Sequence, residues 1–473
     1  MTAPLRILQK HTRIGDPHVT SDDANRLSIL RAIFESLVRR APGGLYRPCL
    51  AKRWDLSNDA RMWTFELRED VVFHDGKLLE VADVATSLTR IRDESVGGEL
   101  GTTGVFQSYL AGSTIETTGS HTVVLTTPEP TADLLDLLVD IPILSKQAIA
   151  QLPEAFVGTG PYRLADRSDA SVLLTKNARY WASGDRPDAI EWRSVPDPQE
   201  RLEHLLAGQA DVAGALPPSA RTDLEEAPRV RLVGAQTSVC ATFMCNLFDG
   251  PCTHRAVRQA LNYALNVPDL IKTVAGDAAR PLTGPLTALH LGFDLETPGY
   301  AYDPKRARDL LDRAGVGPTL GLTLDVPTTL PDEATALARK MAESYSDIGI
   351  ETQIVEHHDR PAYAERVRAK QIHDAACFDS SPLSTFRVFR EKFHSGLRGP
   401  WWLGYDNPRV NRLIDTARTT VDITERQGLY RQVYRLLNED APWIFLYNPI
   451  RYLGVSRALR AWHPSPEGYI TIS

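Results

Sequence analysis

Hydrophobic residues along this chain follow two different periods, which predicts a mixture of strands and helices. Trp63, Phe65 and Leu67 alternate with polar residues, the two-residue period of a strand that buries one face. Helical spacing, with apolar residues every three or four positions, occurs at 27–37, 81–91, 132–139, 198–206, 254–275, 303–314 and 423–437. Together these patterns predict a mixed α/β fold.

Aspartates stand where several of these helices are predicted to begin. Asp22 or Asp23, Asp303 and Asp422 can each cap the first turn that follows. We expect the first helix to continue to the turn at 42–44, where a proline and two glycines end it.

Two regions indicate how the strands pair. The strand at 320–326, the helix at 332–348 and the strand at 350–356 form a strand–helix–strand unit, which implies a parallel pair with a crossover. Residues 442–447 form a nearly continuous apolar run, as expected for a strand that is buried on both faces.

Length and composition indicate more than one domain and exclude several protein classes. The 473 residues, 42% hydrophobic and 24% charged, are typical of a globular chain that is too long for a single domain. A net charge of −7 without a basic stripe argues against a nucleic-acid partner. No apolar run approaches the roughly 18–20 residues of a membrane span, and residues 1–6 do not have the pattern of a secretory signal.

The search for catalytic, cofactor and metal motifs is negative. Gly158-Thr159-Gly160 lacks the third glycine and the following helix of a dinucleotide-binding loop. No Walker A loop, G-x-S-x-G elbow or H-E-x-x-H motif occurs. Neighbouring side chains of the extended segment 356–359, which contains two histidines, point to opposite faces and do not converge on a metal. We therefore expect a non-catalytic protein without a cofactor.

Five cysteines leave at least one thiol unpaired within the chain. Cys240, Cys245 and Cys252 are close in sequence, but their spacing does not match the short paired spacings of structural zinc sites. Buried or bridged thiols are therefore favoured over a metal site.

Aromatic residues in two predicted loops are candidates for a ligand site. Trp401, Trp402 and Tyr405 lie beside glycines, where they form either a packed core or a wall on which a ligand stacks. Phe106 lies in the long predicted surface loop at 95–113, and such loops often carry function.

Asp379 is a candidate of a different kind, because it follows the apolar strand 375–378. A carboxylate at a strand end can face a cleft or can cap the turn that follows. Position alone favours the turn cap.

Short motifs follow one another along the chain in a fixed order. They include residues 50–54, 63–68, 72–77, 158–162, Asn177-x-x-Tyr180-Trp181, 207–211, 255–264, Tyr302-Asp303-Pro304 and Tyr405-x-Asn407-Pro408. Their order, from about residue 10 to the end, resembles the family 5 (oligopeptide, dipeptide and nickel type, cluster C) extracellular solute-binding proteins of ABC transporters.

The resemblance implies a two-lobe, periplasmic-binding-protein-like α/β fold of type II with a two-segment hinge. The first lobe would comprise 1–42, 158–238 and 441–473, with an extra α/β subdomain at 43–157. The second lobe would comprise 239–440. Ligand would be enclosed as the lobes close.

The resemblance also assigns roles to two residues of the second lobe. In peptide-binding members, a carboxylate at the end of a strand pairs with the α-amine of the ligand, and Asp379 resembles that residue. The usual continuation Asp-Tyr-Pro-Asp-Pro differs from residues 379–383 here, which counts against a generic peptide ligand. Arg387 could favour an anionic ligand group, with a solvated helix face as the other interpretation.

Residues 16–18, Asp-Pro-His, resemble a family motif whose following loop usually borders the cleft. Thr20 and Ser21 are therefore expected to lie near the ligand.

Some relatives carry a disulfide from the start of the second lobe to a cysteine two residues before the aspartate. Cys377 has that spacing, with Cys240 or Cys245 as its partner. Free buried thiols are the alternative.

We therefore predict the substrate-binding component of an ABC importer, which captures a peptide or peptide-like small solute and delivers it to the transmembrane permease subunits. We expect a monomer, in the periplasm or otherwise outside the cytoplasm. The alternatives are a metal-chelate (nickel-type) binding protein and a cytoplasmic ligand sensor without a signal sequence. An enzyme is the least favoured interpretation.

Overall fold

The computed structural model describes residues 3–20, 23–41, 45–98, 106–316, 320–329, 331–460, 462–465 and 468–472. The chain forms two compact units, residues 1–235 with 451–473 and residues 236–450, and passes between them twice. Every helix in the described part of the chain falls short of the length or the apolar character that crossing a bilayer demands. The finer division of the predicted first lobe, with its extra subdomain, stays a prediction.

A mixed sheet forms the centre of the first unit. Its strands follow the order β11 (Val212–Ala213), β1 (Leu5–Gln9), β10 (Ala189–Ser194), β9 (Ser171–Lys176) and β8 (Tyr162–Arg167). β1 is parallel to both of its neighbours, so Ile7 lies between Trp192 and Val212. All three side chains are fully buried, which makes β1 the central strand of this core.

A second sheet of the first unit is antiparallel. Its order is β4 (Ala51–Leu56), β5 (Met62–Leu67), β7 (Thr122–Thr126) and β6 (Thr114–Thr118). Trp63, Phe65 and Leu67 of β5 are buried and the residues between them are more exposed, which confirms the predicted half-buried strand. Helix α2 (Val81–Arg90) packs against β6 and β7 through its predicted apolar face.

The first helix begins as predicted but ends early. The Asp23 carboxylate accepts hydrogen bonds from the backbone N–H groups of Asn25 and Arg26 and caps α1 (Ala24–Ile33). The predicted continuation to the turn at 42–44 is wrong, because Phe34 is extended and the chain enters β2. The remaining elements of the first unit are β2 (Val38–Ala41), β3 (Leu45–Pro48), η2 (Glu94–Val96), α3 (Gln107–Leu110), α4 (Leu135–Leu138), η4 (Ile149–Gln151), α5 (Pro198–Leu206), α6 (Ala220–Glu226) and β12 (Val230–Gln236).

The Gly158–Tyr162 motif brings two backbones together at the end of α1. The Gly160 N–H donates to the Ile33 carbonyl oxygen at 2.9 Å. A Cβ atom on Gly158 would lie 2.0 Å from that same oxygen, and one on Gly160 would lie 2.5 Å from the Ala32 carbonyl oxygen. The motif therefore needs glycine for close packing.

The second unit is also built on a mixed sheet. Its order is β16 (Ile350–His357), β15 (Leu320–Pro327), β17 (Ala375–Ser380), β13 (Cys240–Cys245) and β18 (Trp443–Ser456), with β14 (Ala279–Pro281) also paired to β18. β15 and β16 are parallel and joined by α10 (Ala334–Ser346), which confirms the predicted strand–helix–strand unit. The apolar run at 442–447 is buried, as predicted, and forms the start of β18 from Trp443 onward.

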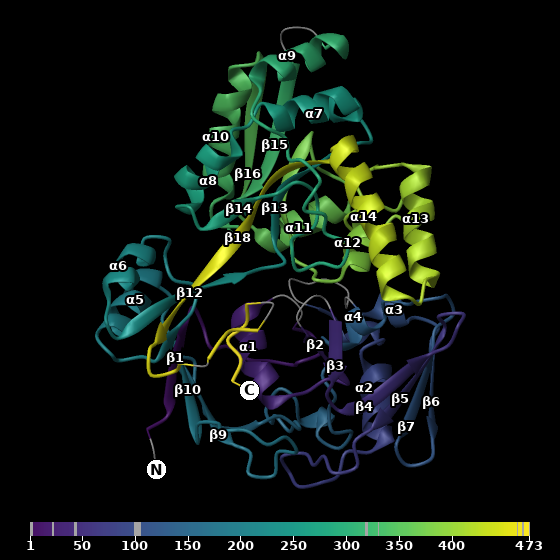
Figure 1. Ribbon diagram of the computed structural model, residues 1–473, viewed down its shortest axis with the longest axis vertical. Helices are drawn as coiled ribbons and strands as arrows, with labels where there is room; N and C mark the ends of the chain where they lie inside the picture. The colour runs from purple at the N-terminus through teal and green to yellow at the C-terminus, as the bar shows by residue number, and fades with distance from the viewer. Residues whose placement is uncertain are drawn as a thin grey trace. The chain divides into compact units, whose positions relative to one another are not determined.

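The other helices of the second unit are η5 (Pro251–Thr253), α7 (Arg255–Tyr263), α8 (Val267–Ala275), α9 (Pro304–Arg313), α11 (Arg360–Arg368), α12 (Thr385–Phe393), α13 (Pro408–Thr419) and α14 (Ile423–Asp440). Asp303 and Asp422 cap α9 and α14 as predicted, each accepting a backbone N–H three residues further on. Figure 1 shows α13 and α14 running side by side, and the two helices contact each other.

Arg258 fixes the C-terminal end of α14. It is buried on α7, and its guanidinium donates to the carbonyl oxygens of Cys252, Thr253, Asp440 and Ala441. Carbonyl groups at a helix end lack donors within the helix, so a buried arginine can satisfy several at once. One side chain thereby joins α7, η5 and α14.

Replacing Arg258 by methionine (R258M) should lower the free energy of unfolding by about 3 kcal/mol, because several buried carbonyl groups lose their donor. Urea unfolding followed by circular dichroism measures the change. R255M is the matched control, since Arg255 lies on the same helix but is largely exposed and pairs with Glu439. Its loss should cost less than about 1 kcal/mol. Equal effects of the two substitutions would contradict this role of Arg258.

Candidate functional site

Asp379 lies in a row of residues across three neighbouring strands of the second unit. On β17 it pairs with Ala241 of β13, and Ala241 pairs in turn with Tyr447 of β18. Residues in register on adjacent strands point to the same face of a sheet. Asp379 and Tyr447 therefore flank the small side chain of Ala241 on one face.

The carboxylate of Asp379 has no hydrogen bond or ion pair with any other residue of the described ranges. Its side chain is only partly exposed. Burial and the negative charge of Glu333 raise the pKa of Asp379 to about 7, and the positive charge of Arg360 opposes this shift. A partly buried carboxylate without a donor is unfavourable, so this position favours a cationic partner from outside the chain.

Glu333 and Tyr447 were not among the candidates from the sequence. Glu333 stands at the start of α10, and the fully buried Tyr447 hydroxyl donates to its Oε1 at 2.9 Å. Because β15 and β17 are parallel, the helix that follows β15 begins at the sheet edge where β17 ends. The predicted strand–helix–strand unit could therefore have pointed to Glu333 from the sequence alone. Tyr447 could be found only once the order of the strands was known.

An aromatic cluster accompanies the same strand end. The ring centres of Phe378 and Trp401 lie 4.6 Å apart, and the Arg360 guanidinium lies 4.7 Å from the Phe378 ring centre. Trp401 is partly exposed, with the guanidinium of Arg368 5.9 Å from its ring centre. The structure therefore brings Trp401 to the residue that precedes Asp379.

Trp402 and Tyr405 are buried, and their polar atoms are bonded within the fold. The Trp402 Nε1–H donates to the Tyr405 carbonyl oxygen at 2.7 Å, and the Tyr405 hydroxyl donates to Asp440 Oδ2 at 2.6 Å. Their rings pack edge-on against Phe248 and Phe393. This arrangement fits the packed-core alternative for these two residues.

Arg387 is mostly buried on α12, so the expectation of a solvated helix face is wrong. Its Nε lies 3.1 Å from Glu391 Oε1, one turn further along the helix. Its charge is therefore paired within the chain. Binding of an anionic ligand group by Arg387 stays a prediction.

The candidates of the first unit lie in its interior. Thr20 is buried, and its hydroxyl donates to the Asp16 carbonyl oxygen at 3.4 Å. Phe106 is buried just before α3. Ser21 lies outside the described residues. Contact of these residues with a ligand stays a prediction.

The structure confirms free buried thiols, the alternative to the possible disulfide, and the strand register explains why no bridge forms. All five cysteines are free and buried. Cys377 pairs with Phe243 across β17 and β13. Cys245 is two residues further along, so its Cα lies about 8 Å from that of Cys377, beyond the roughly 7 Å limit for a bridge. Cys240 is three residues away in the other direction and points to the opposite face.

Two histidines of the second unit contact a buried aspartate. Asp325 accepts hydrogen bonds from His357 Nε2 at 2.8 Å and from the His373 backbone N–H at 2.7 Å. Among the residues with a described position, no group of three or more His, Cys, Asp or Glu side chains is arranged so that it could hold a metal ion.

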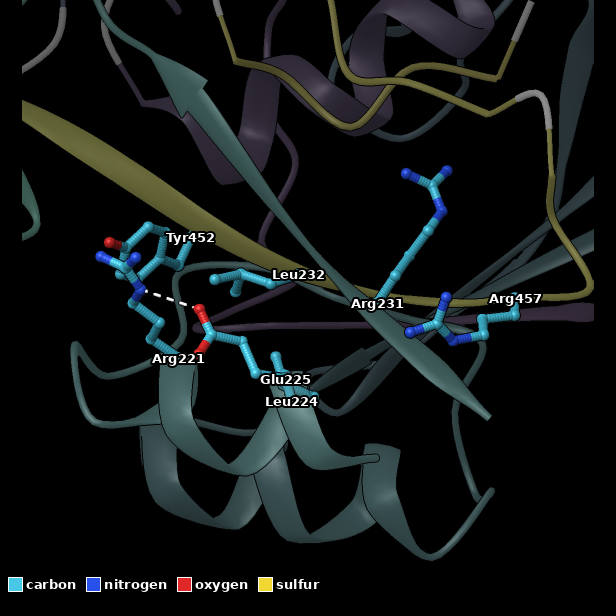
Figure 2. A pocket seen from close by; sticks show the side chains of 7 residues that line it. All are labelled: Arg221, Leu224, Glu225, Arg231, Leu232, Tyr452 and Arg457. Carbon is cyan, nitrogen blue, oxygen red and sulfur yellow. Dashed lines mark hydrogen bonds and ion pairs between the residues drawn. The ribbon is translucent and has the colours of Figure 1, made fainter. Parts of the chain in front are cut away.

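A hollow of about 460 Å³ in the first unit contains none of the predicted residues. It is lined by Arg221, Leu224, Glu225, Arg231, Leu232, Tyr452 and Arg457. Figure 2 shows Arg221 bonded to Glu225, with Arg231 and Arg457 directed elsewhere. The three arginines do not converge on one point, so the hollow lacks the geometry of an anion site.

Comparison with known proteins identifies the chain. Residues 46–379, most of its length, match the model of the bacterial extracellular solute-binding proteins, family 5 (middle). The chain belongs to this family.

Several named proteins match this chain over nearly its whole length. Di/tripeptide-binding protein 2 of Pseudomonas aeruginosa is 27% identical, over 92% of this chain and 87% of its own. Glutathione-binding protein GsiB of Pectobacterium atrosepticum is 26% identical, over 96% and 90%. The structure of HbpA2 from Haemophilus parasuis superposes with a TM-score of 0.87 at 22% identity, over 99% of both chains. The last comparison confirms the predicted fold class.

The raised pKa of Asp379 makes the stability of this solute-binding protein depend on pH. The folded state retains the proton up to about pH 7, whereas the usual pKa of aspartate is 3.8. The contribution of the protonated Asp379 carboxyl to the free energy of unfolding is therefore fully present below about pH 4. It is lost as the pH rises to about 7. The loss cannot exceed about 4 kcal/mol, the equivalent of three pKa units. The substitution D379N removes the group that titrates. The stability of D379N relative to the wild type should therefore increase from pH 4 to pH 7.

Urea unfolding at a series of pH values measures this difference. E351Q, which neutralises an exposed carboxylate on β16, should follow the wild type at every pH. Parallel curves for D379N and the wild type would show that the pKa of Asp379 is not raised.

Proposed function

We propose that this solute-binding protein captures a peptide or peptide-like small solute by its free amine and delivers it to the permease subunits of an ABC importer. The observation that carries the proposal is the carboxylate of Asp379, partly buried at the end of β17 and without a donor among the described residues. The relatives named for di/tripeptides and for glutathione support it, because all of these solutes have a free amine.

The chemistry of an ammonium group fits this position. An ammonium carries three N–H donors and one positive charge, so it can satisfy a carboxylate that has neither a donor nor a counter-ion pair. Trp401 packs against Phe378, which the alternation of β17 turns to the face opposite Asp379, so contact of the Trp401 ring with the solute stays a prediction.

The proposal includes closure of the two lobes over the solute and action outside the cytoplasm. The two passages of the chain between the units support a hinge that lets the lobes close over a ligand. Membership of an extracellular family supports action outside the cytoplasm, as a binding protein without catalysis.

Asparagine in place of Asp379 (D379N) should weaken binding of a dipeptide such as dialanine about 100-fold, because the buried ammonium loses its counter-charge. Isothermal titration calorimetry at pH 7 measures the affinity, and thermal unfolding without ligand verifies that the variant is folded. E351Q is the matched control and should bind as the wild type does. Unchanged affinity of D379N would overturn the role of Asp379.

Native mass spectrometry of the purified protein tests the solute class independently. A co-purified or added di- or tripeptide should remain bound, and an excess of nickel–histidine complex should not displace it. Displacement by the nickel complex, or binding of that complex alone, would support the metal-chelate alternative instead.

A further inference from the structure

The charges around the end of β17 do not cancel. When Asp379 is ionised, both it and Glu333 are negative, and Arg360 at the start of α11 supplies one positive charge that acts on Asp379. Stacking of its guanidinium over Phe378 gives Arg360 a defined position. A lone carboxylate beside this arginine would be neutralised and would attract a cation only weakly. The second carboxylate restores an excess of negative charge.

Glu333 is held in place by one hydrogen bond and lies at the start of a helix. Its Oε1 accepts the hydroxyl of Tyr447, a fully buried residue of β18. It also occupies the cap position of α10, a helix of 13 residues, where the first backbone N–H groups favour negative charge. Its Oε2 makes no hydrogen bond with the described part of the chain, so one oxygen remains available to a ligand.

A small residue lies between Asp379 and the tyrosine that binds Glu333. Asp379 and Tyr447 are separated by Ala241, whose side chain is a single methyl group. The hydrogen bond between Tyr447 and Glu333 joins the second carboxylate to the row of Asp379, Ala241 and Tyr447, and the negative charge of Glu333 raises the pKa of Asp379.

We propose that Glu333 is a specificity-determining residue: with Asp379 it forms a pair of carboxylates that holds one cationic group of the ligand and rejects a neutral group of the same size. Tyr447 is the positioning residue that orients Glu333. The three N–H donors of an ammonium allow it to contact both carboxylates. This inference rests on the proposed function, in which Asp379 receives the amine.

Paired ligands test the inference. Dialanine carries the ammonium, and isobutyryl-alanine carries a neutral methyl group in its place at nearly the same size. The wild type should prefer dialanine strongly, and E333Q should lower this preference at least tenfold, as measured by titration calorimetry or by competition at pH 7. Glutamine keeps the volume and can still accept the Tyr447 hydroxyl, so folding is retained. E343Q, on the exposed side of α10, is the matched control and should leave the preference unchanged.

E333Q has a second effect, on the protonation of Asp379, and measurement at pH 7 keeps this effect small. E333Q also lowers the pKa of Asp379, but at pH 7 that carboxyl is already about half ionised, so relief of protonation can strengthen binding by no more than about twofold. A tenfold loss therefore reports the missing charge of Glu333. Y447F should give a smaller loss in the same direction, because Glu333 keeps its charge and loses its orientation.

The outcomes separate this inference from the proposed function. If D379N loses the preference for dialanine and E333Q retains it, the proposed function stands and the role of Glu333 is wrong. If the wild type does not distinguish the two ligands, the proposed function falls, and the role of Glu333 falls with it. If E333Q weakens both ligands equally, Glu333 acts on the structure of the site and not on its specificity.

Discussion

The end of β17 depends on one constraint: the carboxylate of Asp379 is partly buried and has no hydrogen-bond donor among the described residues. The alternation of the strand places Asp379 on the same face as Cys377, which is packed in the apolar core. The chain could lower this cost with a local donor, yet Arg360 is engaged with the ring of Phe378 and the hydroxyl of Tyr447 is directed to Glu333. The large core of the second unit offsets the cost, as is common at binding sites.

Much of the fold was predictable because it depends on local signals. The period of Trp63, Phe65 and Leu67, the caps at Asp303 and Asp422 and the strand–helix–strand unit around α10 each depend on residues close in sequence. The end of α1 was not predictable in this way. Its apolar spacing continues past Ile33, but the carbonyl groups of its last turn meet the backbone of the Gly158–Tyr162 motif, far away in sequence.

The site was predicted less completely, because it depends on strand register. Asp379 was found from a motif, whereas Glu333 and Tyr447 become its neighbours only through the order of β15, β17, β13 and β18. The same register explains why the possible disulfide does not form, since it puts Phe243 and not a cysteine opposite Cys377. Sequence spacing also could not separate Trp401 from Trp402, which are adjacent residues in different environments.

The burial of all five thiols has a practical consequence for spectroscopy. Alkylating reagents attack accessible thiolates, and burial raises the pKa of several of these thiols, that of Cys49 to about 12. A cysteine engineered at an exposed position would therefore react selectively while the native thiols stay in place. One such label on each unit would make the distance between them measurable in the wild-type background, with and without solute.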